Sequence, residues 1–174
     1  KREIEESVIR LAKGFPAVAI IGPRQSGKTT LARKIFDDYR YISFEDPDTR
    51  LYATEDPRDF LEEYSEKIIF DEIQNVPELL SYLQGIIDRG YEPGKFILTG
   101  SHNFLLMEKV SQSLAGRIGI EVLLPFNTFE MESGGINNSL EDYIIMCGYP
   151  GIYDQNIYHR DFYRSYVATY IERD

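Results

Sequence analysis

The sequence predicts an α/β fold: a five-stranded parallel sheet covered by helices on both faces, followed by a small helical extension. Two observations support this prediction. Short apolar runs without polar alternation, which are typical of strands buried in a parallel sheet, recur along the first 124 residues. Segments with apolar residues at helical spacing separate these runs. Strands that alternate with helices favour a parallel sheet with helices on each side.

The expected strands are 17–21, 41–44, 67–70, 96–98 and 118–124. The helices expected around them are 3–13, 31–36, two short pieces within 49–64, 77–90 and 103–114. After Pro125 the pattern is mostly helical, with breaks at 134–138 and 148–151. We therefore expect a core of residues 1–124 and a lid-like helical extension of residues 125–174.

The last helical stripe reaches the end of the chain. Its apolar residues are Phe162, Tyr163, Tyr166, Val167, Tyr170 and Ile171. No Gly or Pro stop signal follows before Glu172-Arg173-Asp174. From this we expect a further C-terminal domain beyond the extension; a natural frayed C-terminus is the alternative.

The composition narrows the classes of function. The formal net charge is −10 at pH 7, whereas a domain that binds nucleic acid by itself usually carries a basic face. We therefore expect that this segment does not bind nucleic acid by itself, although a further domain could supply that binding. No apolar run approaches the roughly 18 residues of a membrane span, and the N-terminus lacks an apolar signal core. We therefore expect a cytoplasmic protein without a membrane segment. The single Cys147 and the distant His102 and His159 favour neither a disulfide nor a metal site.

A complete phosphate-binding pattern lies between the first strand and the next helix. It reads Gly22-Pro23-Arg24-Gln25-Ser26-Gly27-Lys28-Thr29, with Thr30 directly after it. Glycines permit the backbone angles that turn N–H groups inward around an anion, and the following helix adds its positive end. The pattern predicts that Lys28 bridges the β- and γ-phosphates of a nucleoside triphosphate and that Thr29 coordinates Mg²⁺. Arg24, inside the loop, is a further candidate for a phosphate contact.

Two carboxylates follow the third strand, at Asp71 and Glu72. An apolar strand that ends in Asp brings a carboxylate to the mouth of the sheet, where it can help to hold Mg²⁺. The adjacent Glu72 can orient or deprotonate a water molecule for attack on the γ-phosphate. The pair therefore predicts hydrolysis as well as binding.

Two later positions are candidates for contacts near the γ-phosphate. The fourth strand ends in Thr99-Gly100-Ser101-His102-Asn103, where Ser101 or Asn103 could place a neutral hydrogen-bonding group beside the attacking water. An ordinary turn and helix cap is the alternative for each. Arg117, just before the fifth strand, could stabilise charge in the transition state, within the subunit or across an interface; a surface arginine is its alternative.

Four motifs follow one another along the chain. They are Gly-Pro-Arg-Gln-Ser-Gly-Lys-Thr-Thr at 22–30, Ile-Phe-Asp-Glu-Ile-Gln at 69–74, Ile-Leu-Thr-Gly-Ser at 97–101 and Ser-Leu-Ala-Gly-Arg at 113–117. Together they resemble the AAA+-like ATPases of bacteria and archaea, in the branch that carries an uncharacterised C-terminal domain. Leu-Pro-Phe at 124–126, Gly-Tyr-Pro at 148–150 and Tyr-Ile-Glu-Arg-Asp at 170–174 also look like that branch. The resemblance covers nearly the whole chain.

The resemblance implies a three-layer P-loop NTPase sandwich with strand order 5-1-4-3-2. It implies Walker A roles for Lys28 and Thr29, Walker B roles for Asp71 and Glu72, sensor 1 at Ser101 or Asn103, and an arginine finger at Arg117. A finger that acts between subunits would require a homo-oligomer. The tail holds no clear second sensor arginine; Arg160 and Arg164 are the available candidates.

These features predict a Mg²⁺-dependent ATPase module that binds ATP, releases ADP and drives or gates an attached domain. Adenine is expected from the resemblance, because no guanine-reading Asn-Lys-x-Asp signature occurs. A slow-turnover conformational switch is the main alternative. A small-molecule kinase would need an Arg-rich lid that the tail lacks, and a DNA-associated ATPase would need a basic surface or a partner domain.

Overall fold

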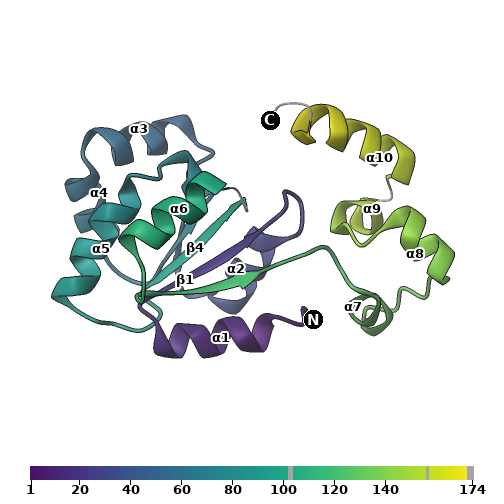
Figure 1. Cartoon of the computed structure of the whole chain (residues 1–174), viewed down its shortest axis with the longest axis horizontal. Helices are drawn as coiled ribbons and strands as arrows, with labels where there is room; N and C mark the ends of the chain where they lie inside the picture. Colours follow the sequence, from purple (N-terminus) through teal and green to yellow (C-terminus); the bar gives the residue numbers. More distant parts are fainter. Residues whose placement is uncertain (102–103, 156, 172–174) are drawn as a thin grey trace.

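The computed structural model describes residues 1–101, 104–155 and 157–171 (Figure 1). One sheet contains five strands: β1 (Ala17–Gly22), β2 (Arg40–Ser43), β3 (Ile68–Asp71), β4 (Phe96–Ser101) and β5 (Ile118–Val122). Their order is β2-β3-β4-β1-β5, and every neighbouring pair is parallel. Counted from the other edge, this is the predicted order 5-1-4-3-2, which is confirmed.

Helices cover both faces of the sheet and complete the three layers (Figure 1). One face carries α1 (Glu5–Gly14) and α2 (Lys28–Ile35), and the other carries α3 (Pro47–Glu55), α4 (Pro57–Glu63), α5 (Leu79–Arg89) and α6 (Phe104–Ser113). The buried strand β1 contributes to both interfaces: Ala17, Ala19 and Ile21 join one core cluster, and Val18 and Ile20 join the other. Successive side chains of a strand point to opposite faces, so a strand covered on both sides needs an unbroken apolar run.

Stacked phenylalanines anchor the strand that carries the acidic motif. The ring of Phe70 lies 5.6 Å from that of Phe44 and 6.3 Å from that of Phe96, measured between ring centres. All three residues are fully buried. Phe70 directly precedes Asp71, so this packing fixes the position at which the carboxylate leaves the sheet.

The tail lies beyond the edge of the sheet where the strands end (Figure 1). It consists of α7 (Thr128–Ser133), α8 (Leu140–Met146), α9 (Pro150–Asp154) and α10 (His159–Tyr166), which continues into a π-helical turn at Val167–Ile171. Asn127 and Glu130 begin α7 with a capping box, and Pro150 is in the first turn of α9. These helices fall within the predicted extension. No helix in the described part of the chain is both long and apolar enough to cross a bilayer.

Candidate functional site

The predicted site residues of three strands converge at one edge of the sheet. The parallel strands β1, β4 and β3 are neighbours, and Gly22 at the end of β1 pairs in register with Ser101 at the end of β4. Asp71 ends β3 on the other side of β4. Because parallel strands end at a common edge, the phosphate loop, the acidic pair and Ser101 come together there.

The phosphate loop curves around the start of α2. Gly27 has φ of 93°, a left-handed conformation that glycine adopts at little cost, and Gln25 has φ of 61°. Lys28 is the first residue of α2 and only 4% exposed, and its ammonium donates to the carbonyl of Pro23 at 2.9 Å. Burial lowers the pKa of Lys28, while the carboxylates of Glu72 and Asp71 act in the opposite direction. This desolvated cation inside the loop suits an anionic ligand.

The Asp71 carboxylate is held by three hydroxyl groups. Thr29 Oγ1 donates to Oδ1 at 2.7 Å, Thr99 Oγ1 donates to the same oxygen, and Tyr41 donates to Oδ2 at 2.9 Å. Burial, together with the charge and hydrogen bond of Asp71, raises the pKa of Tyr41 to about 12, which keeps its hydroxyl protonated as a donor. The adjacent oxygens of Thr29 and Asp71 are of the type that Mg²⁺ prefers.

Glu72 leaves the strand in a left-handed backbone conformation, with φ of 58° and ψ of 47°. Its N–H donates to Thr99 Oγ1 at 3.3 Å, and its carboxylate accepts a hydrogen bond from the amide of Gln74. The same Gln74 amide accepts from the Ser101 N–H at 3.1 Å. Gln74 therefore links the carboxylate to the end of β4.

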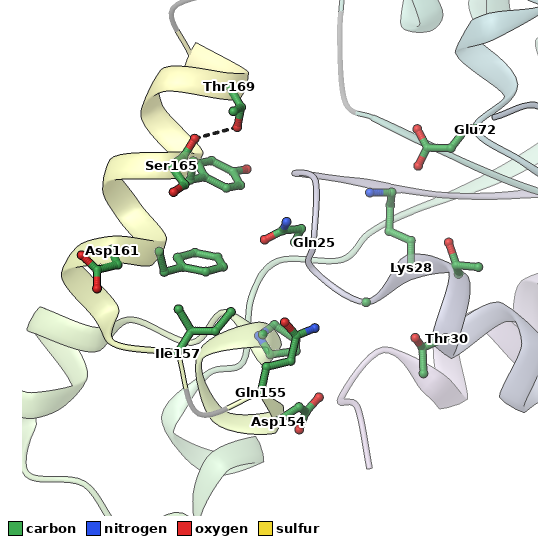
Figure 2. Close-up of a pocket in the computed structure, with 16 residues that line it drawn as sticks. Gln25, Lys28, Thr30, Glu72, Asp154, Gln155, Ile157, Asp161, Ser165 and Thr169 are labelled. Carbon is green, nitrogen blue, oxygen red and sulfur yellow. Dashed lines mark hydrogen bonds between the residues drawn. The ribbon is translucent and has the colours of Figure 1, made fainter.

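A cavity of about 540 Å³ lies between the phosphate loop and the tail. The core lines it with Lys28, Thr29 and Glu72, and the tail lines it with Pro150, Asp154 and Phe162. In Figure 2, Lys28 and Glu72 lie close together at one end, and Thr30 and Asp154 lie toward the other. The volume is within the usual range of small-molecule sites.

Two buried hydroxyl groups lack hydrogen-bond partners within the described residues: Ser26 Oγ in the loop and Ser101 Oγ at the end of β4. Buried polar groups are nearly always paired, so these two hydroxyls are available to a ligand. Ser101 lies at the end of β4, in register with Gly22 of the phosphate loop. Asn103, the other candidate, lies outside the described residues.

The guanidinium groups of the two candidate arginines, Arg24 and Arg117, have partners outside the phosphate loop and the acidic pair. The carbonyl of Arg117 accepts from the N–H of Ala17, the first residue of β1, so Arg117 lies at the opposite edge of the sheet. The six-residue strand β1 is roughly 17 Å long, which is the distance between the side of the sheet where the strands begin and the side where they end. The Arg117 guanidinium instead pairs with Asp88, with Nε–Oδ1 at 2.6 Å. The Arg24 guanidinium lies over the ring of Tyr170, 5.3 Å from its centre.

The placement of Arg117 bears on one of the roles left open by the sequence, a contact with the nucleotide of its own subunit. An arginine at this edge cannot reach a nucleotide in the phosphate loop of its own chain. Two roles are left: a contact across an interface with a second subunit, and a surface arginine that pairs with Asp88.

Several residues of the site are not predicted as site residues by the sequence motifs. Gln74 lies two positions after Glu72 within the quoted acidic motif, and this spacing was its only signal. Tyr41 and Thr99 lie on other strands and are indistinguishable from ordinary core residues until the strand order is known. Arg2, whose guanidinium donates to the carbonyl of Ser26 at 2.9 Å, had no signal at all.

Comparisons with known proteins agree with this arrangement. The family model described as an AAA domain matches residues 14–132. The uncharacterized proteins Rv2008c of Mycobacterium tuberculosis and Mb2031c of Mycobacterium bovis are each 29% identical to the chain over 181 aligned residues. The alignment covers 100% of this chain and 39% of each relative, so the chain spans well under half the length of these proteins.

Solved structures share the fold. The Walker-type ATPase paby2304 of Pyrococcus abyssi superposes with a TM-score of 0.57 at 19% identity, covering 94% of this chain and 70% of the other. The signal transduction ATPase with numerous domains PH0952 of Pyrococcus horikoshii, which has a tetratricopeptide repeat sensor, gives 0.50 at 25% identity, covering 86% and 28%. The sandwich predicted from the sequence is thus a P-loop ATPase fold.

Proposed function

The chain belongs to the AAA domain family, and from that premise we propose that it binds ATP with Mg²⁺, hydrolyses it to ADP and phosphate, and thereby drives or gates the remainder of a longer protein. The observation that carries the proposal is the contact of 2.7 Å between Thr29 Oγ1 and Asp71 Oδ1 beside the buried Lys28. It joins the phosphate loop to the acidic motif, as Mg²⁺-dependent nucleotide chemistry requires.

The residues suit the ligands in charge and in type. Thr29 and Asp71 would hold Mg²⁺, which when bound would neutralise charge on the β- and γ-phosphates. The ammonium of Lys28 would bind the same phosphates, and the N–H groups of the loop would surround them. Ser26 and Ser101 offer buried hydroxyls for further hydrogen bonds. Gly22, Pro23, Arg24, Gln25, Gly27 and Thr30 complete the proposed nucleotide-binding set.

The proposed chemical step uses Glu72 as the base. A water molecule attacks the γ-phosphorus, and the bond between the γ-phosphorus and the β–γ bridging oxygen breaks, so that ADP leaves. One proton of the water passes to the Glu72 carboxylate. Glu72 lines the cavity together with Lys28, which supports this role. Ser101, or Asn103, would orient the water or the γ-phosphate.

Single-turnover hydrolysis of ATP by wild type and by Glu72→Gln tests the proposal. The variant keeps the shape of the side chain but is a far weaker base, so its rate should fall by about 100-fold or more. ATP binding should persist in the variant. Glu62→Gln, an exposed position on α4, is the matched control and should hydrolyse ATP like wild type. Equal rates in Glu72→Gln and wild type would exclude Glu72 as the base.

A slow-turnover switch is the second candidate, because the Gln74 amide already engages the Glu72 carboxylate. A switch of this kind would hold ATP for long periods while Gln74 withholds the base. Multiple-turnover assays of wild type distinguish the two: tight ATP binding with negligible phosphate release would favour the switch.

For Arg117 we propose a role across a subunit interface. Its position, far from the phosphate loop of its own chain, supports this role, in which its salt bridge with Asp88 on α5 would be exchanged for a contact with the nucleotide of a neighbouring chain. Arg117→Ala should bind ATP normally but hydrolyse it slowly, and mixing it with Lys28→Ala should restore part of the activity. Each variant supplies what the other lacks. No recovery in the mixture would exclude this arrangement.

A further inference from the structure

The guanidinium of Arg2 joins three parts of the molecule that are far apart in sequence. Nε donates to Glu130 Oε1 at 3.0 Å, Nη1 donates to the carbonyl of Ser26 at 2.9 Å, and Nη2 donates to the carbonyl of Leu124. Its flat face lies over the ring of Phe126, with Cζ 4.6 Å from the ring centre. The side chain is only 11% exposed. Its planar fork therefore has a defined partner in each direction.

The tail side of this cluster is equally well fixed. The Glu130 carboxylate is 7% exposed and also accepts the N–H of Glu3 at 2.7 Å and the N–H of Asn127 at 3.1 Å. Burial by itself would raise the pKa of Glu130, but the hydrogen bonds from Glu3, Arg2 and Asn127 outweigh burial and lower it. The start of α7 is thus bound through a charged carboxylate to Arg2.

The contact with Ser26 orients a group of the phosphate loop. The carbonyl of Ser26 and the N–H of Gly27 belong to the same peptide unit, and in a trans peptide these two groups point in opposite directions. By holding the carbonyl, Arg2 directs the Gly27 N–H away from itself. Gly27 also lines the cavity between the loop and the tail, where the phosphates of a nucleotide are proposed to lie.

Arg2 also links the two walls of that cavity. Through Ser26 it contacts the phosphate loop, through Leu124 the end of the core, and through Glu130 the beginning of the tail. The tail supplies Pro150 and Asp154 to the opposite wall. A second hollow of about 230 Å³ lies beside Arg2 and shares Gly27, Thr30, Pro150 and Asp154 with the main cavity. Arg2 is therefore placed where the two walls meet.

We infer that Arg2 is a positioning residue for nucleotide binding, which aims the Gly27 N–H at a phosphate and holds the tail wall against the phosphate loop. The inference rests on the proposed function, because the ligand in question is the nucleotide. Arg2 acts through Ser26, Leu124 and Glu130 and does not itself contact the reacting atoms. Its loss should therefore weaken binding more than it slows the chemical step.

Equilibrium titration with ATP and with ADP, in the presence of Mg²⁺, tests the inference on the intact chain. For Arg2→Ala the Kd of both nucleotides should rise by about tenfold, as the loss of an oriented hydrogen-bond donor predicts. The rate of hydrolysis at saturating ATP should stay within about threefold of wild type, since the reacting groups are unchanged. Arg2→Lys should resemble Arg2→Ala, because a single ammonium cannot serve three acceptors in a plane. Arg10→Ala, an exposed arginine on α1, is the control and should bind like wild type.

Hydrogen–deuterium exchange without nucleotide supplies a second readout. In Arg2→Ala, and independently in Glu130→Ala, peptides from residues 125–154 should exchange faster than in wild type, while peptides from β1, β3 and β4 should not. Wild-type Kd values in folded Arg2→Ala would overturn the inference, as would unchanged exchange of the tail. If Arg2→Ala fails to fold, the same two results in Arg2→Lys decide. Absence of nucleotide binding by wild type would instead contradict the proposed function.

Discussion

Thr29 and Asp71, 42 positions apart in the sequence, are joined by a hydrogen bond of 2.7 Å between Oγ1 and Oδ1. Thr29 is the second residue of α2, and Asp71 is the last residue of β3. β4 lies between β3 and β1, the strand that leads into the phosphate loop, and its Thr99 donates to the same carboxylate oxygen. The contact therefore depends on the order of strands as well as on the two motifs, and it fixes the position at which Mg²⁺ is proposed to bind.

Replacing Asp71 by Asn should weaken Mg²⁺-dependent binding selectively. The amide has nearly the shape of the carboxylate but lacks its charge, and charged oxygen ligands contribute most to a hard cation site. The Kd of ATP in the presence of Mg²⁺ should rise by about tenfold, a loss of about 1.4 kcal/mol. With EDTA in place of Mg²⁺, wild type and variant should differ little. Asp38→Asn, at an exposed ion pair with Lys67, is the control; similar Mg²⁺ effects in both variants would contradict the assignment of Asp71.

Lys28→Ala should abolish most nucleotide binding. The substitution removes a 4%-exposed ammonium from the loop, and charge-assisted hydrogen bonds contribute about 1.5–3 kcal/mol each, which corresponds to a 10- to 100-fold change in Kd. Calorimetric titration with ATP measures this change in Kd. Lys34→Ala is a matched control on the same helix, since Lys34 is exposed and pairs with Glu5. Tight binding by Lys28→Ala would rule out the proposed phosphate contact.

Thr99→Val should destabilise the fold and disturb the acidic pair. The fully buried hydroxyl donates to Asp71 and accepts from the N–H of Glu72. Its removal leaves buried polar groups without a partner, at a cost of about 1–3 kcal/mol in the free energy of unfolding. Chemical denaturation measures this loss. Thr99→Ser retains the hydroxyl and should recover much of the stability; equal losses in the two variants would attribute the effect to packing.

Gln74→Ala should change turnover without changing affinity. The Gln74 amide links the Glu72 carboxylate to the Ser101 N–H, and neither contact involves the phosphate loop. If Gln74 holds the base in its active position, the rate at saturating ATP should fall by about tenfold with Kd unchanged. If it withholds the base, as in the switch, the rate should rise. Gln112→Ala on the exposed face of α6 is the control; a wild-type rate in Gln74→Ala would exclude both roles.

Acid should remove part of the stability that Glu130 supplies. Its folded-state pKa is lowered from the ordinary value of 4.5, so its contribution is complete above that value and is lost as the pH falls through the folded-state pKa. Glu130→Gln should therefore be less stable than wild type at pH 7, by about 1–3 kcal/mol. Thermal unfolding between pH 7 and pH 3 should show this difference shrinking below about pH 4.5. A difference that stays constant with pH would assign the effect to shape alone.

Local patterns in the sequence determined the elements and the two main motifs of this protein. The phosphate loop from Gly22 to Thr29 is contiguous, and Asp71 and Glu72 directly follow a buried strand, so their chemistry can be inferred from neighbours along the chain. The strand positions follow from apolar runs for the same reason. The strand order came from the resemblance to a family rather than from these patterns, since periodicity contains no information about which strands are adjacent.

The tertiary structure alone decided which distant groups meet. Tyr41 and Thr99 contact Asp71 only because β2 and β4 flank β3, and neither residue differs in type from ordinary strand residues. Arg117 precedes its strand and Asp71 ends one, so the parallel direction of the sheet places them at opposite edges. Arg2 reaches Ser26 and Glu130 across 24 and 128 positions. Such contacts arise from the packing of complete elements, which is why no local pattern predicts them.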